Sequence, residues 1–328
     1  MNKSIKDIIS KEFQKNGMIQ SNADILGSQA ESVYNRNKDY LDFDFVEQFG
    51  SVGYESQMDR LTELAYVDFL SKNEYKLKTT KGNKKASSNL DIIIKNLGSG
   101  EFNCLHYDKN LNTPEDLKLR LMQGLDKKIV KTWMEIKKGS ITKSQPVILF
   151  YCYSDLLDKG ALPIIVNDVH KDKIPLEVEC VCGQPFKKQN GNEVLARYFV
   201  DKTKWIGTDN KEIIENKNNF YKLRKQIDKD GNVIKDKHGN ERFEVFVDMT
   251  YISAAVFSPF ITNSVFNESL NNTDDCYWNN DLILIHNPNA RNSVKKKPFP
   301  THLEYIVNKN RIKDGYMITC KEIHDKTY

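Results

Sequence analysis

The order in which the hydrophobic pattern changes along residues 54–153 constrains the fold of this chain more than any other feature. Apolar side chains at helical spacing first predict an amphipathic helix over residues 54–72. Three strand-like runs follow, and a Gly-Ser-Gly sequence at residues 98–100 predicts the turn before the last of them. The three runs cover residues 75–80, 90–95 and 102–107.

A second helix and a fourth strand complete this stretch. Thr113 and Pro114 form a favourable helix start, because Thr caps the first turn and Pro suits the first helical position. Apolar residues then recur on one helical face as far as Lys138, and the apolar run at residues 146–153 predicts a buried strand. The order is therefore helix, three strands, helix and strand, which indicates a mixed α/β fold.

The rest of the chain has a weaker pattern. Residues 1–53 begin with a short amphipathic segment and predict a helical or irregular N-terminal part. Short apolar runs alternate with polar turns over residues 156–328, which predicts a β-rich C-terminal region. We place domain boundaries after residues 53 and 155. The polar segment 228–241 carries two Gly-Asn turns, so we expect an exposed hairpin there.

Composition sets limits on the class of protein. The 328 residues are 39% hydrophobic with a net charge of +4, which is typical of a globular protein and only permits nucleic-acid binding. The N-terminus is polar and no run has the apolar length of a membrane span, so we expect a cytoplasmic protein without a membrane partner. Scattered cysteines indicate a reducing compartment, and the abundance of Asn and Lys suggests an AT-rich bacterial or viral genome.

The order helix, three strands, helix, strand in residues 54–153 resembles the core of the PD-(D/E)xK nuclease superfamily, which includes many restriction endonucleases. The resemblance implies a restriction-endonuclease-like αβββαβ core with a β-rich C-terminal extension. It also implies an Asp at the start of the second strand and an acid-x-Lys on the third. Carboxylates from two adjacent strands suit Mg²⁺, which prefers hard oxygen ligands. We therefore expect Mg²⁺ as cofactor and DNA as substrate.

Asp91 matches the second-strand acid, because it is the charged residue that precedes a run of isoleucines. Two acids are candidates on the third strand. Asp108 ends the apolar run, but the Lys expected two residues later is replaced by Asn110. Glu101 lies earlier and has the same defect, with Asn103 in the Lys position.

Further residues would complete the site. Lys95 shares a strand face with Asp91 by the period of two, so it would partly replace the missing Lys. Glu55 flanks the apolar face of the first helix and is the better first-helix acid, whereas Glu63 points away from that face. His106 would approach the site, although a structural role is commoner for such a histidine. We expect the metal ligands to be Asp91, Asp108 and Glu55, and the catalytic residues to be Asp91, Asp108, Lys95 and Glu101.

Three other patterns have simpler explanations. The literal acid-x-Lys at residues 135–137 continues a helical stripe, so we expect it to end the second helix. Cys180 and Cys182 lack the second ligand pair that structural zinc requires. The calcium-like loop at residues 228–232 has its Gly too early and lacks a closing Glu, which favours a plain turn.

The sequence thus predicts a metal-dependent endonuclease-like protein that hydrolyses DNA phosphodiester bonds, for example a type II restriction enzyme. A homodimer would match a palindromic site. The alternative is a non-enzymatic viral or phage structural protein or a nucleic-acid-binding module, which the missing Lys and the weak net charge favour. In the nuclease, Asp91 must converge with Asp108 or Glu101 on a metal; in the alternative it need not.

Overall fold

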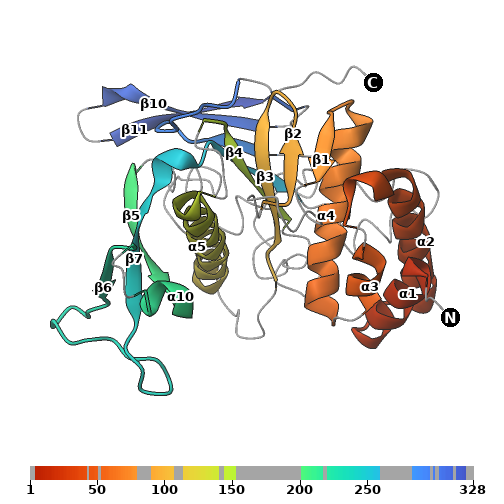
Figure 1. Cartoon of the computed structure of the whole chain (residues 1–328), viewed down its shortest axis with the longest axis horizontal. Helices are drawn as coiled ribbons and strands as arrows, with labels where there is room; N and C mark the ends of the chain where they lie inside the picture. The colour runs from red at the N-terminus through yellow and green to blue at the C-terminus, as the bar shows by residue number, and fades with distance from the viewer. Residues whose placement is uncertain are drawn as a thin grey trace.

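The chain is a mixed α/β protein in which helices flank a mixed β-sheet (Figure 1). The computed structural model describes residues 4–42, 44–50, 53–79, 90–106, 114–139, 144–152, 201–216, 220–258, 283–295, 298–299, 303–312 and 315–322.

The helices are α1 (Ile5–Lys15), α2 (Gln20–Asn37), η1 (Lys38–Tyr40), α3 (Phe45–Gly50), α4 (Tyr54–Lys72), α5 (Pro114–Lys138), α10 (Lys211–Ile214) and η4 (Met249–Tyr251). The strands of the large sheet are β1 (Leu77–Thr79), β2 (Ile92–Ile94), β3 (Gly98–Cys104), β4 (Val147–Cys152), β8 (Ala254–Ser258), β9 (Ile283–His286), β10 (Leu303–Ile312) and β11 (Gly315–Glu322). A smaller sheet contains β5 (Thr203–Thr208), β6 (Leu223–Lys225) and β7 (Phe243–Asp248). None of the described helices combines the length and the apolar composition that a bilayer-crossing segment requires.

The large sheet has the strand order β1-β2-β3-β4-β8-β9-β10-β11. The first three strands form an antiparallel meander, and α5 then carries the chain back so that β4 runs parallel to β3. The predicted order of helix, three strands, helix and strand is therefore present. Strand β8 pairs in parallel with β4, so strands from both sides of the boundary predicted near residue 155 share one sheet.

The turn before β3 lies earlier than the sequence indicated. Gly98 and Gly100 belong to β3 itself, and the chain reverses at residues 95–97, where Asn96 has a left-handed φ of 65°. The absence of a side chain at Gly100 permits close packing, since a Cβ there would lie 2.8 Å from a ring carbon of Phe150. These glycines are not turn residues; within β3 they allow close approach of neighbouring groups. The strand consequently begins earlier than predicted.

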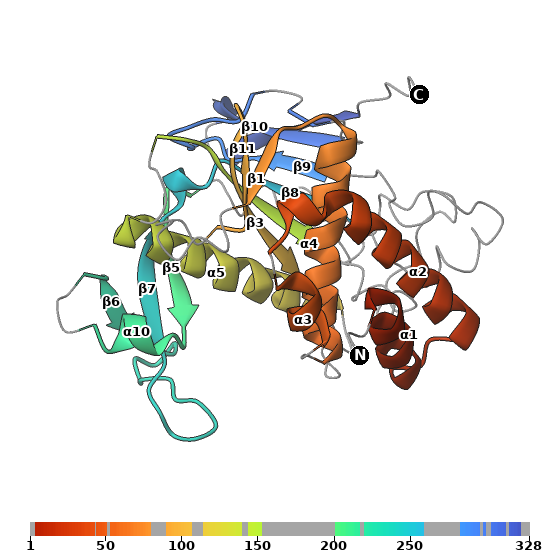
Figure 2. The same cartoon turned by 45° about the vertical axis from the view of Figure 1, so that its right-hand side comes forward.

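Helix α4 lies between the large sheet and the N-terminal helices, as Figure 2 shows. It is therefore buried on nearly all sides. Its Tyr66 ring packs against Phe102 and Phe150, with ring centroids 5.6 and 4.9 Å away, and its hydroxyl donates to the carbonyl of Tyr151 at 2.7 Å. On the other side of α4, the Asp68 carboxylate accepts hydrogen bonds from two guanidinium nitrogens of Arg36 in α2. Residues 5–50 thus pack onto the core through α4.

Helix α5 covers the opposite face of the sheet and separates it from the small sheet (Figure 1). The small sheet buries Ile206, Val245 and Val247 on its inner face, with exposed fractions of 2%, 0% and 1%. Beyond β6 the chain forms two successive tight loops at residues 228–232 and 236–240.

The two loops have the same design. Asp228 accepts hydrogen bonds from the N–H groups of Asp230 and Asn232, at 2.9 and 2.8 Å, and Asp236 repeats this pattern eight positions later. The backbone N–H of Asn232 is the largest influence on the pKa of Asp228, which lies below its usual value. The carboxylate is therefore occupied by its own loop, as expected of a plain turn rather than a calcium site.

Candidate functional site

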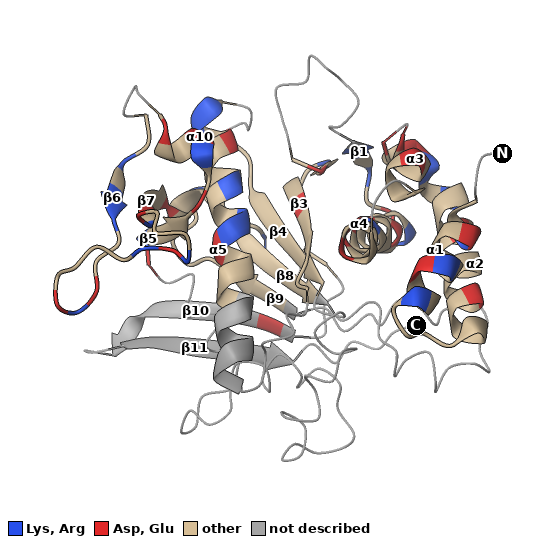
Figure 3. Cartoon of the chain, turned by 90° about the horizontal axis from the view of Figure 1, so that it is seen from below, with Lys and Arg blue, Asp and Glu red and all other residues tan. Residues whose placement is uncertain are grey.

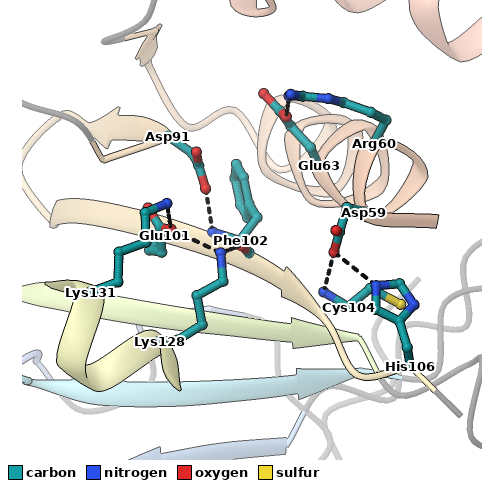
Figure 4. A network of polar contacts seen from close by, with 10 residues as sticks. All are labelled: Asp59, Arg60, Glu63, Asp91, Glu101, Phe102, Cys104, His106, Lys128 and Lys131. Atoms are coloured by element: carbon teal, nitrogen blue, oxygen red, sulfur yellow. Dashed lines mark hydrogen bonds and ion pairs between the residues drawn. The ribbon is translucent and has the colours of Figure 1, made fainter. Parts of the chain in front are cut away.

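Strands β2 and β3 separate after a short stretch of pairing, and this separation creates the candidate site. Their pairing ends at Ile92 and Gly100, whereas β3 continues to Cys104. The N–H groups of Phe102 and Cys104 then point to the open edge, and leaving them unpaired would be costly. Asp91 accepts from Phe102 at 2.7 Å, and Asp59 of α4 accepts from Cys104 at 3.2 Å. Figure 4 shows both carboxylates at this edge.

We call this region the fork site and define it by six side chains from four parts of the chain. Asp59 comes from α4, Asp91 precedes β2, Glu101 and His106 come from β3 and its end, and two lysines come from α5. The members are Asp59, Asp91, Glu101, His106, Lys128 and Lys131.

Glu101 is the most buried carboxylate of the fork site. Its residue is 1% exposed, and it lies on β3 directly before Phe102, whose N–H donates to Asp91. Its Oε1 accepts from Lys128 Nζ at 2.9 Å and from Lys131 Nζ at 2.6 Å. Its Oε2 has no hydrogen-bond partner among the residues that the structure describes. A buried carboxylate is costly unless it is paired, so the two lysines stabilise it while one oxygen stays available.

The placement of the lysines follows from the geometry of α5. Lys128 and Lys131 are three positions apart and therefore lie on one side of the helix. One turn earlier, a Cβ on Gly124 would lie 2.4 Å from a methyl carbon of Leu105, so glycine lets α5 approach the end of β3 closely. Lys128 also donates to the carbonyl of Phe102 at 2.8 Å. The helix is thus tied to the open edge of β3.

Asp59 and His106 form a second pair in the fork site. His106 Nε2 lies 3.3 Å from Asp59 Oδ1. Burial raises the pKa of Asp59, but the hydrogen bond and charge of His106, the N–H of Cys104 and the charge of Lys128 together outweigh it. The pKa of Asp59 is therefore lowered, and this carboxylate is ionised at neutral pH.

Tyr151 lies on β4, beside the strand that carries Glu101. It is buried, and its hydroxyl has no hydrogen-bond partner among the described residues. Burial raises the pKa of Tyr151 well above its usual value, and the negative charges of Glu101 and Asp126 add to that effect. Tyr151 is consequently a neutral phenol close enough to Glu101 to respond to its charge.

Two of the predicted site residues, Asp91 and Glu101, lie in the fork network, where Asp91 accepts from the N–H of Phe102, the residue after Glu101. Lys95 lies exposed in the turn at the other end of β2. Glu55 lies exposed in the first turn of α4 and is not part of the fork network. Asp108 lies outside the described residues, as do Cys180 and Cys182.

Three members of the fork site were not predicted from the sequence. Asp59 lies one turn after Glu55 on α4, and the two lysines lie on α5 beside its apolar stripe. The literal acid-x-Lys at residues 135–137 lies within the last turns of α5, as expected. Glu63, expected to point away from the apolar face, is 6% exposed and accepts from Arg60 at 2.8 Å.

The side chains of the fork site fit a magnesium ion in part of its coordination. No group of three or more His, Cys, Asp or Glu that would hold a metal occurs among the described residues. Mg²⁺, however, is commonly held by one or two carboxylates together with substrate phosphates and water. Asp91 and Glu101 supply two carboxylates beside β3, and Glu101 Oε2 is an unused acceptor among the described residues.

Comparison with known proteins assigns no family to this chain. No protein-family model matches it, and no match was found among curated proteins or among solved structures. Its function therefore has to be argued from the geometry of the fork site.

Proposed function

We propose that the protein hydrolyses phosphodiester bonds in DNA with Mg²⁺ at the fork site. The supporting observation is Glu101, which is buried, held by two lysines through one oxygen, and left with its other oxygen unused among the described residues. A buried acceptor without a partner is costly. A divalent cation shared with Asp91 would satisfy it.

The residues would divide the work as follows. Asp91 and Glu101 would hold Mg²⁺, which when bound polarises the scissile phosphate and neutralises developing negative charge. Lys128 and Lys131 fix the Glu101 carboxylate. Their positive charge would stabilise the phosphate as it becomes more negative. The fixed charges need little rearrangement during the reaction, and this is the main source of such stabilisation.

The lysines of α5 would supply the positive charge that the acid-x-Lys pattern normally takes from its Lys. Asn103 stands two residues after Glu101, so β3 supplies no cation at that position. Lys95 was expected to compensate, but it is exposed at the far end of β2. Lys128 lies 2.9 Å from Glu101 and has the charge that the chemistry needs. We therefore assign to Lys128, assisted by Lys131, the role that the pattern gives to the strand lysine.

A non-enzymatic nucleic-acid-binding protein is the second candidate. The observation in its favour is the same cluster, because two ammonium groups already neutralise Glu101 and oppose a divalent cation electrostatically. In that case the cluster would only anchor α5 to β3. The two candidates differ in whether DNA is cut when Mg²⁺ is present.

The decisive experiment incubates purified protein with supercoiled plasmid and with single-stranded DNA, in Mg²⁺ and in EDTA. We expect cleavage in Mg²⁺ alone. Asp91→Asn and Glu101→Gln should abolish it, and Lys128→Met should reduce it about 100-fold, as expected for loss of one group that stabilises developing charge. Lys127→Met is the matched control, since Lys127 is an exposed neighbour on the same helix.

Two outcomes would contradict the proposal. Full activity of Glu101→Gln, with a folded protein by circular dichroism, would remove Glu101 from the site. Lack of cleavage by the parent protein with Mg²⁺ or Mn²⁺ on both substrates would favour the non-enzymatic candidate. Asp108→Asn tests a third ligand, and light scattering tests the homodimer that a palindromic target would require.

A further inference from the structure

The outer face of the small sheet, turned away from α5, combines aromatic and basic side chains. Alternation along the strands places Trp205 of β5 and Phe246 of β7 side by side on this face. Lys222, which directly precedes β6, and Arg224 of β6 lie on the same face, beside Phe246 and Glu244. We call these five residues the aromatic–cationic face.

The cations of this face lie over the aromatic rings. The guanidinium carbon of Arg224 is 4.4 Å from the Trp205 ring centroid. Lys222 Nζ is 5.0 Å from the centroid of Phe246 and 5.8 Å from that of Trp205. The two rings meet edge to face with centroids 5.2 Å apart. Two π-systems and two positive charges are thus concentrated on one short stretch of sheet.

The two cations are exposed to solvent, and the Trp205 and Phe246 side chains beneath them are half-buried. The Arg224 side chain is 53% exposed although it pairs with Glu244 at 2.6 Å, and Lys222 is exposed. Figure 3 shows further basic residues along α5, the helix on which this sheet packs. The fold does not need such an arrangement, because the apolar contacts of this sheet lie on its inner face.

We propose that the aromatic–cationic face binds a single-stranded segment of nucleic acid. The exposed Lys222 and Arg224 side chains would turn from the ring faces to hold phosphates, and bases would stack on Trp205 and Phe246 in their place. An exposed antiparallel sheet that carries aromatic side chains can stack unpaired bases, and neighbouring cations follow the backbone. A duplex keeps its base faces inside the stack and so cannot use the rings. An apolar protein surface would have no use for the two cations. Charge and ring chemistry together therefore select an unpaired polynucleotide.

This inference rests on the proposed function, from which it takes DNA as the polymer. It adds that the substrate contains unpaired nucleotides. The small sheet packs on α5, the helix that carries Lys128 and Lys131 to the fork site. A DNA strand bound on the aromatic–cationic face would therefore lie on a sheet that packs against α5, the helix that carries the proposed catalytic lysines.

The test measures binding in EDTA, so that cleavage plays no part. The probes are a fluorescein-labelled dT15 strand, the same strand annealed to dA15, and heparin as a competitor without bases. We expect the full-length protein to bind the single strand more tightly than the duplex, and heparin to compete poorly. Lys222→Gln combined with Arg224→Gln should weaken binding of the single strand and lower the salt slope by about 1.4, since each single-strand phosphate contact contributes about 0.7.

Lys225→Gln is the matched control. Lys225 is adjacent on β6, is 50% exposed like Arg224, and by alternation projects from the other side of the sheet, where it pairs with Glu241. It should leave the affinity and the salt slope unchanged. Phe246→Leu keeps an apolar side chain but removes the ring, and we expect about tenfold weaker binding, as for the loss of one stacked base.

Several results would overturn the inference. These are no binding of dT15, tighter binding of the duplex, equal competition by heparin, or an equal loss of affinity in Lys225→Gln. If Phe246→Leu fails to fold, the double variant Lys222→Gln and Arg224→Gln still tests the inference. Glu101→Gln should bind dT15 normally in EDTA. Binding of dT15 by a parent protein that cuts no DNA in Mg²⁺ or Mn²⁺ would contradict the proposed function and leave this inference standing.

Discussion

The fork site and the aromatic–cationic face use the same kinds of charged side chain in opposite environments. In the fork site, Lys128 and Lys131 converge on Glu101, which is 1% exposed. On the outer face of the small sheet, Arg224 pairs with Glu244 while half of its side chain stays in solvent. The distances are similar, at 2.6–2.9 Å and 2.6 Å. Burial, not distance, decides how much each pair matters to folding.

The physical reason is solvation. A buried charge that loses its partner keeps its desolvation cost and gains nothing in return. An exposed charge that loses its partner is solvated by water and screened by salt. We therefore expect substitutions in the fork site to change the free energy of unfolding, and substitutions on the outer face to change ligand binding alone.

The largest effect should come from Lys128→Met combined with Lys131→Met. This leaves the Glu101 carboxylate buried without its two cations, which should lower the free energy of unfolding by about 3–5 kcal/mol. Denaturant titration measures it. Adding Glu101→Gln should recover more than half of the loss, and Lys127→Met serves as control. A loss below about 1 kcal/mol would mean that Glu101 is solvated or otherwise paired.

A smaller effect of opposite sign is expected at Tyr151. Its buried hydroxyl has no partner among the described residues, so Tyr151→Phe should be neutral or should stabilise the fold by about 1 kcal/mol. Tyr66→Phe is the contrasting control, because the Tyr66 hydroxyl donates to the Tyr151 carbonyl at 2.7 Å. That variant should lose about 1 kcal/mol. If Tyr151→Phe destabilises as much as Tyr66→Phe, the Tyr151 hydroxyl has a partner such as a buried water.

The pH dependence should be weaker still, because the Asp59 side chain is 50% exposed. The folded-state pKa of Asp59 lies below its unfolded value. The unfolded chain then binds the proton more readily, so the stability from Asp59 is present above the unfolded pKa and is lost as pH falls through the folded pKa. We expect Asp59→Asn to flatten the loss of stability below about pH 4. An unchanged acid titration would show that Asp59 is not coupled to folding.

The smallest effect is expected on the outer face. Arg224→Gln removes one exposed ion pair and one cation from over Trp205, and should change the free energy of unfolding by no more than about 1 kcal/mol. Thermal unfolding at low and high salt is the measurement, with Lys225→Gln as the reference. A loss comparable to that of the Lys128 and Lys131 variant would erase the distinction between the two regions.

The sequence predicted those parts of the fold that depend on local patterns. The helices α4 and α5 have the expected bounds, because each carries its own apolar stripe and its own start signal. The error at residues 98–100 came from reading glycines as turn residues. Their role becomes visible only when Phe150, about fifty positions later in the chain, packs on Gly100.

Local sequence patterns predicted fewer of the residues in the candidate site. Asp91 and Glu101 were named because both lie beside strands with a clear pattern. Lys128 and Lys131 were missed because their link to Glu101 depends on how α5 crosses the sheet, which no short-range pattern encodes. Asp59 was missed for a similar reason, since its partner Cys104 is 45 positions away and is met through a backbone N–H that any residue would offer.

The separation of β2 from β3 also has a consequence for self-association. An open strand edge can recruit a strand from another molecule, and proteins commonly block such edges with charge. Here Asp91 and Asp59 occupy the N–H groups of Phe102 and Cys104, so the edge offers no donors to a neighbouring chain. An Asn at either position retains a carbonyl oxygen that can fill the same place, whereas an Ala would expose the edge. Alanine variants of these two residues should therefore aggregate more readily than the matching asparagine variants.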